Sequence, residues 1–214
     1  MLKKVQPLPL VEVAEYLSPF APHFKRSEGR ESLERHVTGL LADIACKNGE
    51  QIAAAVAGTN SQRLQALLTE LQWDATAVNA QRVTQLIHAA TAGEGVLIFD
   101  DTGMPKQGSA SVGVARQYSG TLGKVANCQV VVSCQCADTR FSWPVNARLY
   151  LPESWTQDAA RGARAQGPEE ARQFATKPEI ALTLLDEAAR WGGPYRAVTA
   201  DSAYAAIPGQ ERKG

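Results

Sequence analysis

Apolar residues recur at three- and four-residue steps through much of the first half of the chain, which is the spacing of one helix face. The longest such stripe covers residues 32–44, and Asn48 and Gly49 follow it as a predicted helix end. Three further helices are predicted: residues 51–57, a helix capped by Ser61, and a helix that begins at Thr76 or Asn79. The pattern therefore predicts a helical accessory domain over residues 29–92.

The first 28 residues lack this pattern. Prolines interrupt any long helix there, because proline has no amide hydrogen for the helix to use; they are Pro7, Pro9, Pro19 and Pro22. At most one short helix is expected, near Val11–Leu17. Residues 1–28 are therefore predicted to be an irregular segment. The group Phe20, His23 and Phe24 is predicted to be a packing anchor, and Trp73 is predicted to be an anchor in the helical core.

Short apolar runs replace the helical pattern in the second half of the chain. Four segments are predicted to be strands: residues 96–99, 128–137, 141–151 and 197–200. One helix is predicted over residues 177–190, and loops over 108–123 and 152–168. Pro144 indicates an edge strand or a bulge. The order strand, strand, strand, helix, strand predicts a mixed α/β domain over residues 93–214, with its first three strands antiparallel.

Composition and charge narrow the class of protein. The 214 residues are 44% hydrophobic and 21% charged, which is typical of a folded globular protein, and no apolar run is long enough for a membrane helix. The net charge of zero argues against a strongly cationic nucleic-acid binder. Between Thr102 and Ala137, however, the only charged residues are Lys106, Arg116 and Lys124. This acid-free span is either a surface that attracts phosphate or a neutral surface with three solvated cations.

The four cysteines do not form a metal-binding motif. Cys134 and Cys136 are separated by one residue, not by the two of common zinc ribbons, and neither Cys46 nor Cys128 completes a pair with suitable spacing. In a strand, Cys134 and Cys136 would point to the same face. We therefore expect free thiols, which suit a reducing cytosol.

Aspartates follow two of the predicted strands. Asp100 and Asp101 come directly after residues 96–99, and Asp201 comes directly after residues 197–200. Carboxylates at such positions are costly unless they are paired, hydrogen-bonded or bound to a cation. If they converge, they make an oxygen-rich site that suits Mg²⁺ or Mn²⁺. The alternative is that Asp101 only caps a turn made with the two residues after it.

Three stretches together resemble one known family. They are FDDTGMPKQG at 99–108, SVGVARQYSGTLGKVANCQVVVS at 111–133 and TADSAY at 199–204. The chain resembles the DDE transposases of bacterial insertion sequences, which have a ribonuclease-H-like catalytic domain. The resemblance implies that Asp101 and Asp201 are the first two catalytic carboxylates and metal ligands. Asp101 is preferred to Asp100 because the family's catalytic aspartate directly precedes threonine, and Thr102 is expected to orient it.

The same resemblance implies a function. It implies DNA cleavage and strand transfer with Mg²⁺ or Mn²⁺ in the bacterial cytoplasm, on insertion-sequence ends and target DNA. Lys106, Arg116 and Lys124 are expected to position the DNA, the helical domain is a candidate for binding end DNA, and a homo-oligomer is left open. The family's third carboxylate, a glutamate, is expected beyond residue 214, since Glu211 is only ten residues after Asp201. The ribonuclease-H-like core is therefore expected to be incomplete at its C-terminus.

Two alternatives remain at this stage. A phosphatase with an aspartate nucleophile would need a second aspartate two residues after the first, where Thr102 and Gly103 stand. The other alternative is a truncated transposase fragment that has lost catalysis and retains at most DNA binding.

Overall fold

The computed structural model describes residues 11–89, 95–163, 172–193 and 195–204. The chain divides into two compact units, Met1–Arg82 and Val83–Gly214. Glu211 lies outside the described residues.

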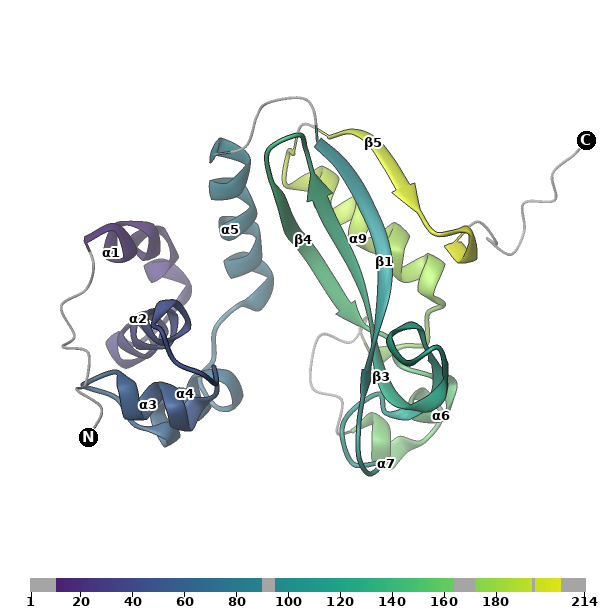
Figure 1. Ribbon diagram of the computed structural model, residues 1–214, viewed down its shortest axis with the longest axis horizontal. Helices are drawn as coiled ribbons and strands as arrows, with labels where there is room; N and C mark the ends of the chain where they lie inside the picture. Colours follow the sequence, from purple (N-terminus) through teal and green to yellow (C-terminus); the bar gives the residue numbers. More distant parts are fainter. Residues whose placement is uncertain (1–10, 90–94, 164–171, 194, 205–214) are drawn as a thin grey trace, which may run out of the picture. The chain divides into compact units, whose positions relative to one another are not determined.

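The first unit is built from short helices. In chain order they are α1 (Val11–Leu17), the 3-10 helix η1 (Ser18–His23), α2 (Ser27–Leu41), α3 (Gly49–Ala55), α4 (Ser61–Thr69) and the first part of α5 (Ala75–Ala89) (Figure 1). The short helix α1 has the predicted bounds. The four helices predicted after it are all present, so the helical N-terminal part of the predicted fold is confirmed.

Amide and carboxylate side chains set where three of these helices begin. The side-chain oxygen of Asn48 accepts a hydrogen bond from the backbone N–H of Gln51 and caps α3. Asn60 caps α4 in the same way, and Asp74 accepts from the backbone N–H three residues later, in the first turn of α5. Two predicted helix ends are therefore wrong. Asn48 caps α3 and does not end the helix before it, and α4 is capped by Asn60 and not by Ser61. An N-cap residue must stand just outside the helix, where its side chain can reach a free amide.

Helix α2 buries small residues where leucines were predicted to pack. Leu40 and Leu41 are 44% and 65% exposed, whereas Gly39 is buried. A Cβ atom on Gly39 would lie 2.2 Å from Cγ2 of Ile52, a fully buried residue of α3. The absence of a side chain at Gly39 therefore lets the two helices approach closely, and this contact decides which face of α2 is covered.

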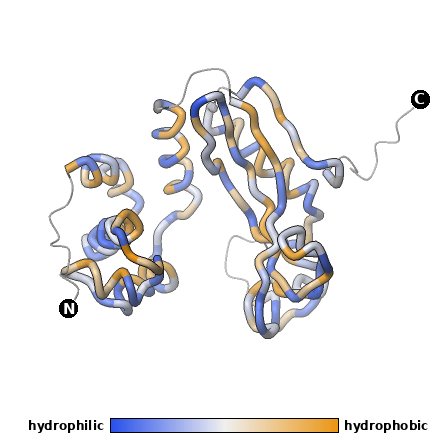
Figure 2. The backbone as a smooth tube through the Cα atoms, viewed as in Figure 1, coloured by the Kyte–Doolittle hydropathy of each residue, from blue (hydrophilic) through white to orange (hydrophobic). Residues whose placement is uncertain are grey.

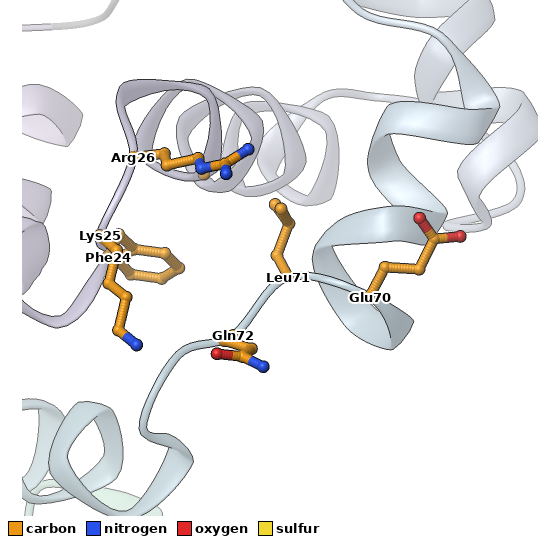
Figure 3. Close-up of a pocket in the computed structure, with 7 residues that line it drawn as sticks. Phe24, Lys25, Arg26, Glu70, Leu71 and Gln72 are labelled. Atoms are coloured by element: carbon orange, nitrogen blue, oxygen red, sulfur yellow. The ribbon is translucent and has the colours of Figure 1, made fainter.

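Two small apolar clusters hold the helical unit together. Phe20, Phe24 and Leu67 form the centre of one, and Ile52, Val56 and Leu64 form the other. Trp73 closes the first cluster, since its ring stacks on Phe24 with centroids 5.9 Å apart and its Nε1–H donates to the carbonyl of Leu67 at 2.8 Å. Phe20, Phe24 and Trp73 are confirmed as packing anchors, whereas His23 is half-buried and does not belong to the cluster. A pocket beside this cluster is lined by Phe24, Lys25, Arg26, Gly29, Glu70, Leu71 and Gln72 (Figure 3).

The second unit is a mixed sheet with a long helix packed on one face. Its strands are β1 (Gly95–Pro105), β2 (Ala115–Ser119), β3 (Lys124–Ala137), β4 (Ser142–Leu149) and β5 (Tyr195–Ala200). Its helices are η2 (Gly120–Leu122), α6 (Glu153–Thr156), α7 (Ala159–Gly162), α9 (Lys177–Arg190) and η3 (Ser202–Tyr204). The strand order is β2-β3-β1-β5, and β4 also pairs with β3. β3 is antiparallel to β1, β2 and β4, whereas β5 is parallel to β1 (Figure 1).

Three of the predicted boundaries in this unit are wrong. β1 continues to Pro105, so Asp100 and Asp101 lie within the strand and not after it, because β3 offers backbone partners as far as Cys128. The segment 108–123 contains β2, which pairs with β3. The segment 152–168 contains the short helices α6 and α7. The predicted order of the other strands and of the long helix is confirmed, as is the bulge, since the β3–β4 register shifts opposite Pro144.

Alternation along β3 separates a covered face of the sheet from an open one. The buried side chains are Cys128, Val130, Val132, Cys134 and Cys136. Helix α9 covers this face with Ile180, Leu184 and Ala188, and Val83 from α5 joins the same core. Cys134 and Cys136 share a face as predicted, and all four cysteines are free. Figure 2 shows β1 changing from hydrophobic to hydrophilic along its length. The mixed α/β class is therefore confirmed.

Candidate active site

The parallel pairing of β1 and β5 brings the predicted aspartates to one region of the sheet. The register pairs Leu97 with Val198 and Phe99 with Ala200, and Ala200 is the last residue of β5. Asp201 follows it directly, at the level where β1 continues into its two aspartates. Two segments separated by 100 residues in the sequence thus deliver carboxylates to neighbouring positions.

Asp101 lies on the covered face of the sheet and forms an ion pair there. Its position alternates with those of the buried Leu97 and Phe99, and its partner in β3 is the buried Val132. Oδ2 of Asp101 accepts a hydrogen bond from Nζ of Lys177, the first residue of α9, at 2.5 Å. The side chains of Asp101 and Lys177 remain 25% and 32% exposed. The carboxylate is therefore charge-paired and still accessible.

The neighbouring polar residues have other environments. Asp100 and Thr102 are exposed and project from the opposite face of β1, as adjacent residues in a strand must. The carboxylate of Asp100 accepts a hydrogen bond from the backbone N–H of Asp101 at 2.7 Å. Asp201 is exposed, and its carboxylate accepts from the hydroxyl of Ser202 at 3.0 Å. Asp101 is thus the one residue of the three that is directed at α9.

The phenol of Tyr204 lies near enough to these three carboxylates for their negative charges to act on it. Burial, and then the negative charges of Asp101, Asp100 and Asp201, raise the pKa of its phenol well above the ordinary value of 10.0. The phenol therefore stays neutral and can act as a hydrogen-bond donor at physiological pH. Its hydroxyl is buried and has no hydrogen-bond partner among the residues that the structure describes. A single side chain thus lies within the field of all three aspartates.

Comparison with known proteins assigns the family. The model of the family described as DDE superfamily endonuclease matches residues 19–209. The chain belongs to the DDE superfamily endonucleases. A curated relative from Microchaete diplosiphon, a probable transposase for insertion sequence element IS701, is 28% identical over 204 residues. That alignment covers 94% of this chain and 50% of the relative, so the chain spans about half the length of the curated relative it matches.

The family agrees with the observed fold. A mixed sheet with a long helix on one face, preceded by helices, is consistent with a ribonuclease-H-like DDE nuclease domain. The resemblance inferred from the three sequence stretches is confirmed at the level of the DDE superfamily endonucleases, and the chain is similar to a probable insertion-sequence transposase. Within the described part of the chain, no helix is long and apolar enough to cross a membrane.

The oxygen donors of this DDE endonuclease suit a hard divalent cation. Mg²⁺ is usually held by one or two protein carboxylates and keeps several waters, and Asp101 and Asp201 are the two carboxylates predicted for this role. The described residues contain no cluster of three or more His, Cys, Asp or Glu side chains that could hold a metal. The residues therefore fit a cation that is completed by water or substrate oxygens, and they do not form a closed protein cage.

The three predicted cations do not form one group. Arg116 pairs with Asn127 across the β2–β3 ladder, and Asn127 also bonds the backbone of Lys106, so Lys106 and Arg116 flank the same residue of β3. Lys124 pairs with Ser119 at the other end of the hairpin. Because Lys124 is three positions from Asn127, alternation puts its side chain on the opposite face. All three cations are exposed.

Two residues of this region were missed from the sequence. The sequence places Lys177 in a helix but indicates no role for its side chain. A cation in the first turn of a helix is unfavourable next to the helix dipole, and this was the one local signal that the sequence offered. Tyr204 is the last residue of the stretch TADSAY, and the sequence indicates no role for its side chain. Sequence spacing gives no sign that either residue lies near Asp101, because the sheet and α9 bring them together across 76 and 103 positions of the chain.

Proposed function

We propose that this chain carries the first two carboxylates of an insertion-sequence transposase that cleaves DNA and transfers the cut strand with Mg²⁺ or Mn²⁺. Asp101 and Asp201 hold the cation, and Asp100 takes no direct part. A divalent cation at such a site activates water or a 3′-hydroxyl and stabilises the leaving oxygen of a phosphodiester. The substrates are insertion-sequence ends and target DNA, and the protein acts in the reducing bacterial cytoplasm.

The observation that supports this proposal is the parallel β1–β5 register. It sets Asp201 beside the segment of β1 that contains Asp101, and Tyr204 lies in the field of both carboxylates. A capping role for Asp101 is not supported, since the residue lies inside a strand. Thr102 projects away from Asp101, so any orienting effect would act through the backbone of β1.

The chain's own residues have distinct tasks in this proposal. Asp101 presents an accessible carboxylate on the covered face of the sheet, and Asp201 presents a second from the end of β5. Tyr204 stays protonated and supplies an O–H donor to an oxygen in the site. We propose that the helical accessory domain predicted over residues 29–92 makes a second DNA contact, and that the domain predicted over residues 93–214 carries the catalytic carboxylates.

The proposal is tested by metal binding and DNA nicking with matched aspartate variants. Binding of Mn²⁺ is measured from the loss of the free-ion paramagnetic resonance signal, and nicking from the relaxation of supercoiled DNA. We expect Asp101→Asn and Asp201→Asn to abolish Mn²⁺ binding. Asp186→Asn is the control, because Asp186 is an exposed carboxylate on α9. Unchanged Mn²⁺ affinity in Asp101→Asn would refute the proposed site.

The DNA contact is tested separately by its salt dependence. Lys106 and Arg116 flank one residue of β3, whereas Lys124 projects from the opposite face, so alanine variants of the pair and of Lys124 are measured separately as well as together. Each lost phosphate contact should weaken DNA binding and reduce the log–log salt slope by about one. Arg140→Ala is the control, since Arg140 is an exposed cation that stacks on Phe141 at the β3–β4 turn. A triple variant with the slope of the unchanged protein would remove these residues from the interface.

A second candidate function is the binding of DNA and metal without catalysis of strand cleavage. It is favoured by the described residues alone, which contain no group of three or more His, Cys, Asp or Glu side chains that could hold a metal. Two carboxylates hold two ions less firmly than three, so we expect weak nicking at most. Robust nicking that disappears in Asp101→Asn would reject this candidate, whereas Mn²⁺ binding without nicking would favour it.

A further inference from the structure

Lys177 is fixed at the start of α9 by a complete set of local signals. Thr176 is the N-cap and forms a capping box with Glu179, whose carboxylate accepts hydrogen bonds from both the N–H and the hydroxyl of Thr176. Pro178 follows in the first turn, where its fixed φ angle suits a helix start. The backbone of Lys177 is therefore held in one place relative to the sheet that α9 covers.

The positive charge of Lys177 does not stabilise the helix in which the residue lies. The N-terminus of a helix carries partial positive charge, so a cation in the first turn is unfavourable there. The side chain instead leaves the helix and reaches β1, where its Nζ lies 2.5 Å from Oδ2 of Asp101. The same ammonium lies 5.9 Å from the centroid of the Tyr150 ring, within range of a cation–π contact. The ammonium thus contacts both the Asp101 carboxylate and the Tyr150 ring.

This ammonium and a divalent cation would compete for the negative charge of the same carboxylate. Mg²⁺ binds carboxylate oxygens at about 2.0–2.1 Å, so a metal on Oδ2 would lie close to the ammonium nitrogen. Two cations at that separation repel each other, and both cannot bind Oδ2 at full strength. Metal binding on Oδ2 therefore requires Lys177 to withdraw, and metal binding on the other oxygen of Asp101 would still be opposed by the nearby ammonium. The partial exposure of both side chains leaves room for Lys177 to move.

We infer that Lys177 is the internal counter-ion of Asp101 and that it sets the affinity of the site for divalent metal. This role rests on the proposed metal site. In the metal-free protein the ammonium holds Asp101 in one orientation and neutralises its charge. A divalent cation then has to displace it, so the site binds metal more weakly than its carboxylates alone would. Lys177 is in this sense a positioning residue that acts through Asp101.

The test is the Mn²⁺ affinity of full-chain variants at position 177. Lys177→Met removes the ammonium and keeps the length of the side chain, so Mn²⁺ should bind about five times more tightly, as expected for the loss of a partly buried ion pair. Lys177→Gln is a second neutral variant and should behave in the same way. Lys177→Arg keeps the charge pair and should stay within about twofold of the original protein.

Two controls separate this inference from the metal site itself. Arg190→Met removes a cation from the far end of the same helix and should leave Mn²⁺ affinity unchanged. If Asp101→Asn abolishes binding but both neutral variants at position 177 bind like the original protein, the counter-ion role is wrong and the metal site stands. If neither the original protein nor the neutral variants bind Mn²⁺, both the metal site and the counter-ion role are overturned. Binding by the neutral variants alone would support the counter-ion role most directly.

Discussion

The close approach of α2 and α3 at Gly39 leads to a prediction that opposes the usual rule for helices. Replacing an interior helix glycine with alanine normally stabilises a helix by about 1 kcal/mol. At Gly39 the added methyl group would lie 2.2 Å from Cγ2 and 2.8 Å from Cγ1 of Ile52, and Ile52 is fully buried. Overpacking of this kind costs about 1–3 kcal/mol. Because the Gly39 clash is severe, the net effect of Gly39→Ala should be a loss of about 2 kcal/mol.

The assay is unfolding of the full chain by urea and, separately, by heat, each followed by the helical circular-dichroism signal. A loss of about 2 kcal/mol should lower the thermal midpoint of a unit of this size by roughly 8–16 °C. Gly49→Ala is the matched control, since a Cβ atom at that position meets nothing within 4 Å. Its effect should stay within about 0.5 kcal/mol, as is usual away from packed sites.

A double variant identifies the cause of the loss. Ile52→Ala alone should destabilise by about 2–5 kcal/mol, because it empties a buried site. Combined with Gly39→Ala, the total should be at least about 1 kcal/mol smaller than the sum of the two single losses, because the new methyl group then occupies the vacated space. A Gly39→Ala variant that is more stable than the original protein would refute the close approach of the two helices.

Three further predictions concern the second unit and the thiols. In the folded protein only Cys46 should react rapidly with a chromogenic disulfide reagent, and all four thiols should react after denaturation, because the other three are buried and burial raises their pKa. Burial raises the pKa of the Cys134 thiol from 9.0 to about 12. The folded protein therefore holds that proton more tightly than the unfolded chain. This contribution is complete below about pH 9 and is lost as the pH rises towards 12, so the alkaline loss in urea unfolding should be smaller in Cys134→Ala. Trp155→Phe should lower the unfolding free energy by about 1–3 kcal/mol in the same assay, since it leaves the Val114 carbonyl without its 2.8 Å partner in a buried site.

Local patterns were sufficient for the elements that carry their own signal. The stripe of α9 and the alternation of β3 are long enough to be read without tertiary information, and both were predicted close to their observed bounds. The strand β2 was missed because it has five residues within a Gly- and Ser-rich stretch, and its pairing with β3 is what makes it a strand. β1 was cut short at Phe99 because charged residues do not look like a strand until a partner strand is known.

The candidate site was likewise predictable only where residues carry a local sequence signal. Asp101 and Asp201 could be proposed because each follows an apolar run and belongs to a recognisable motif. The helix α9, which packs on the face of the sheet formed by β3 and β4, could not be placed from spacing alone, so the contact of Lys177 with Asp101 remained hidden. The covered face of α2 was also misjudged, because a single glycine opposite Ile52 outweighs the two leucines next to it.

The β1–β5 pairing also fixes when the site can form during synthesis. Its partners Gly95 and Tyr195 are 100 residues apart, and this parallel pairing cannot be completed until β3, β4 and α9 have been made. A ribosome adds about 5–20 residues per second, so Asp101 waits roughly 5–20 s for Asp201 to emerge. During that interval the edge of β1 that later receives β5 has no native partner in the nascent chain. Of the strand pairings in the described sheet, β1–β5 joins the residues farthest apart in the sequence, so we expect the pairing that forms last to be the one that brings Asp201 to the level of Asp101.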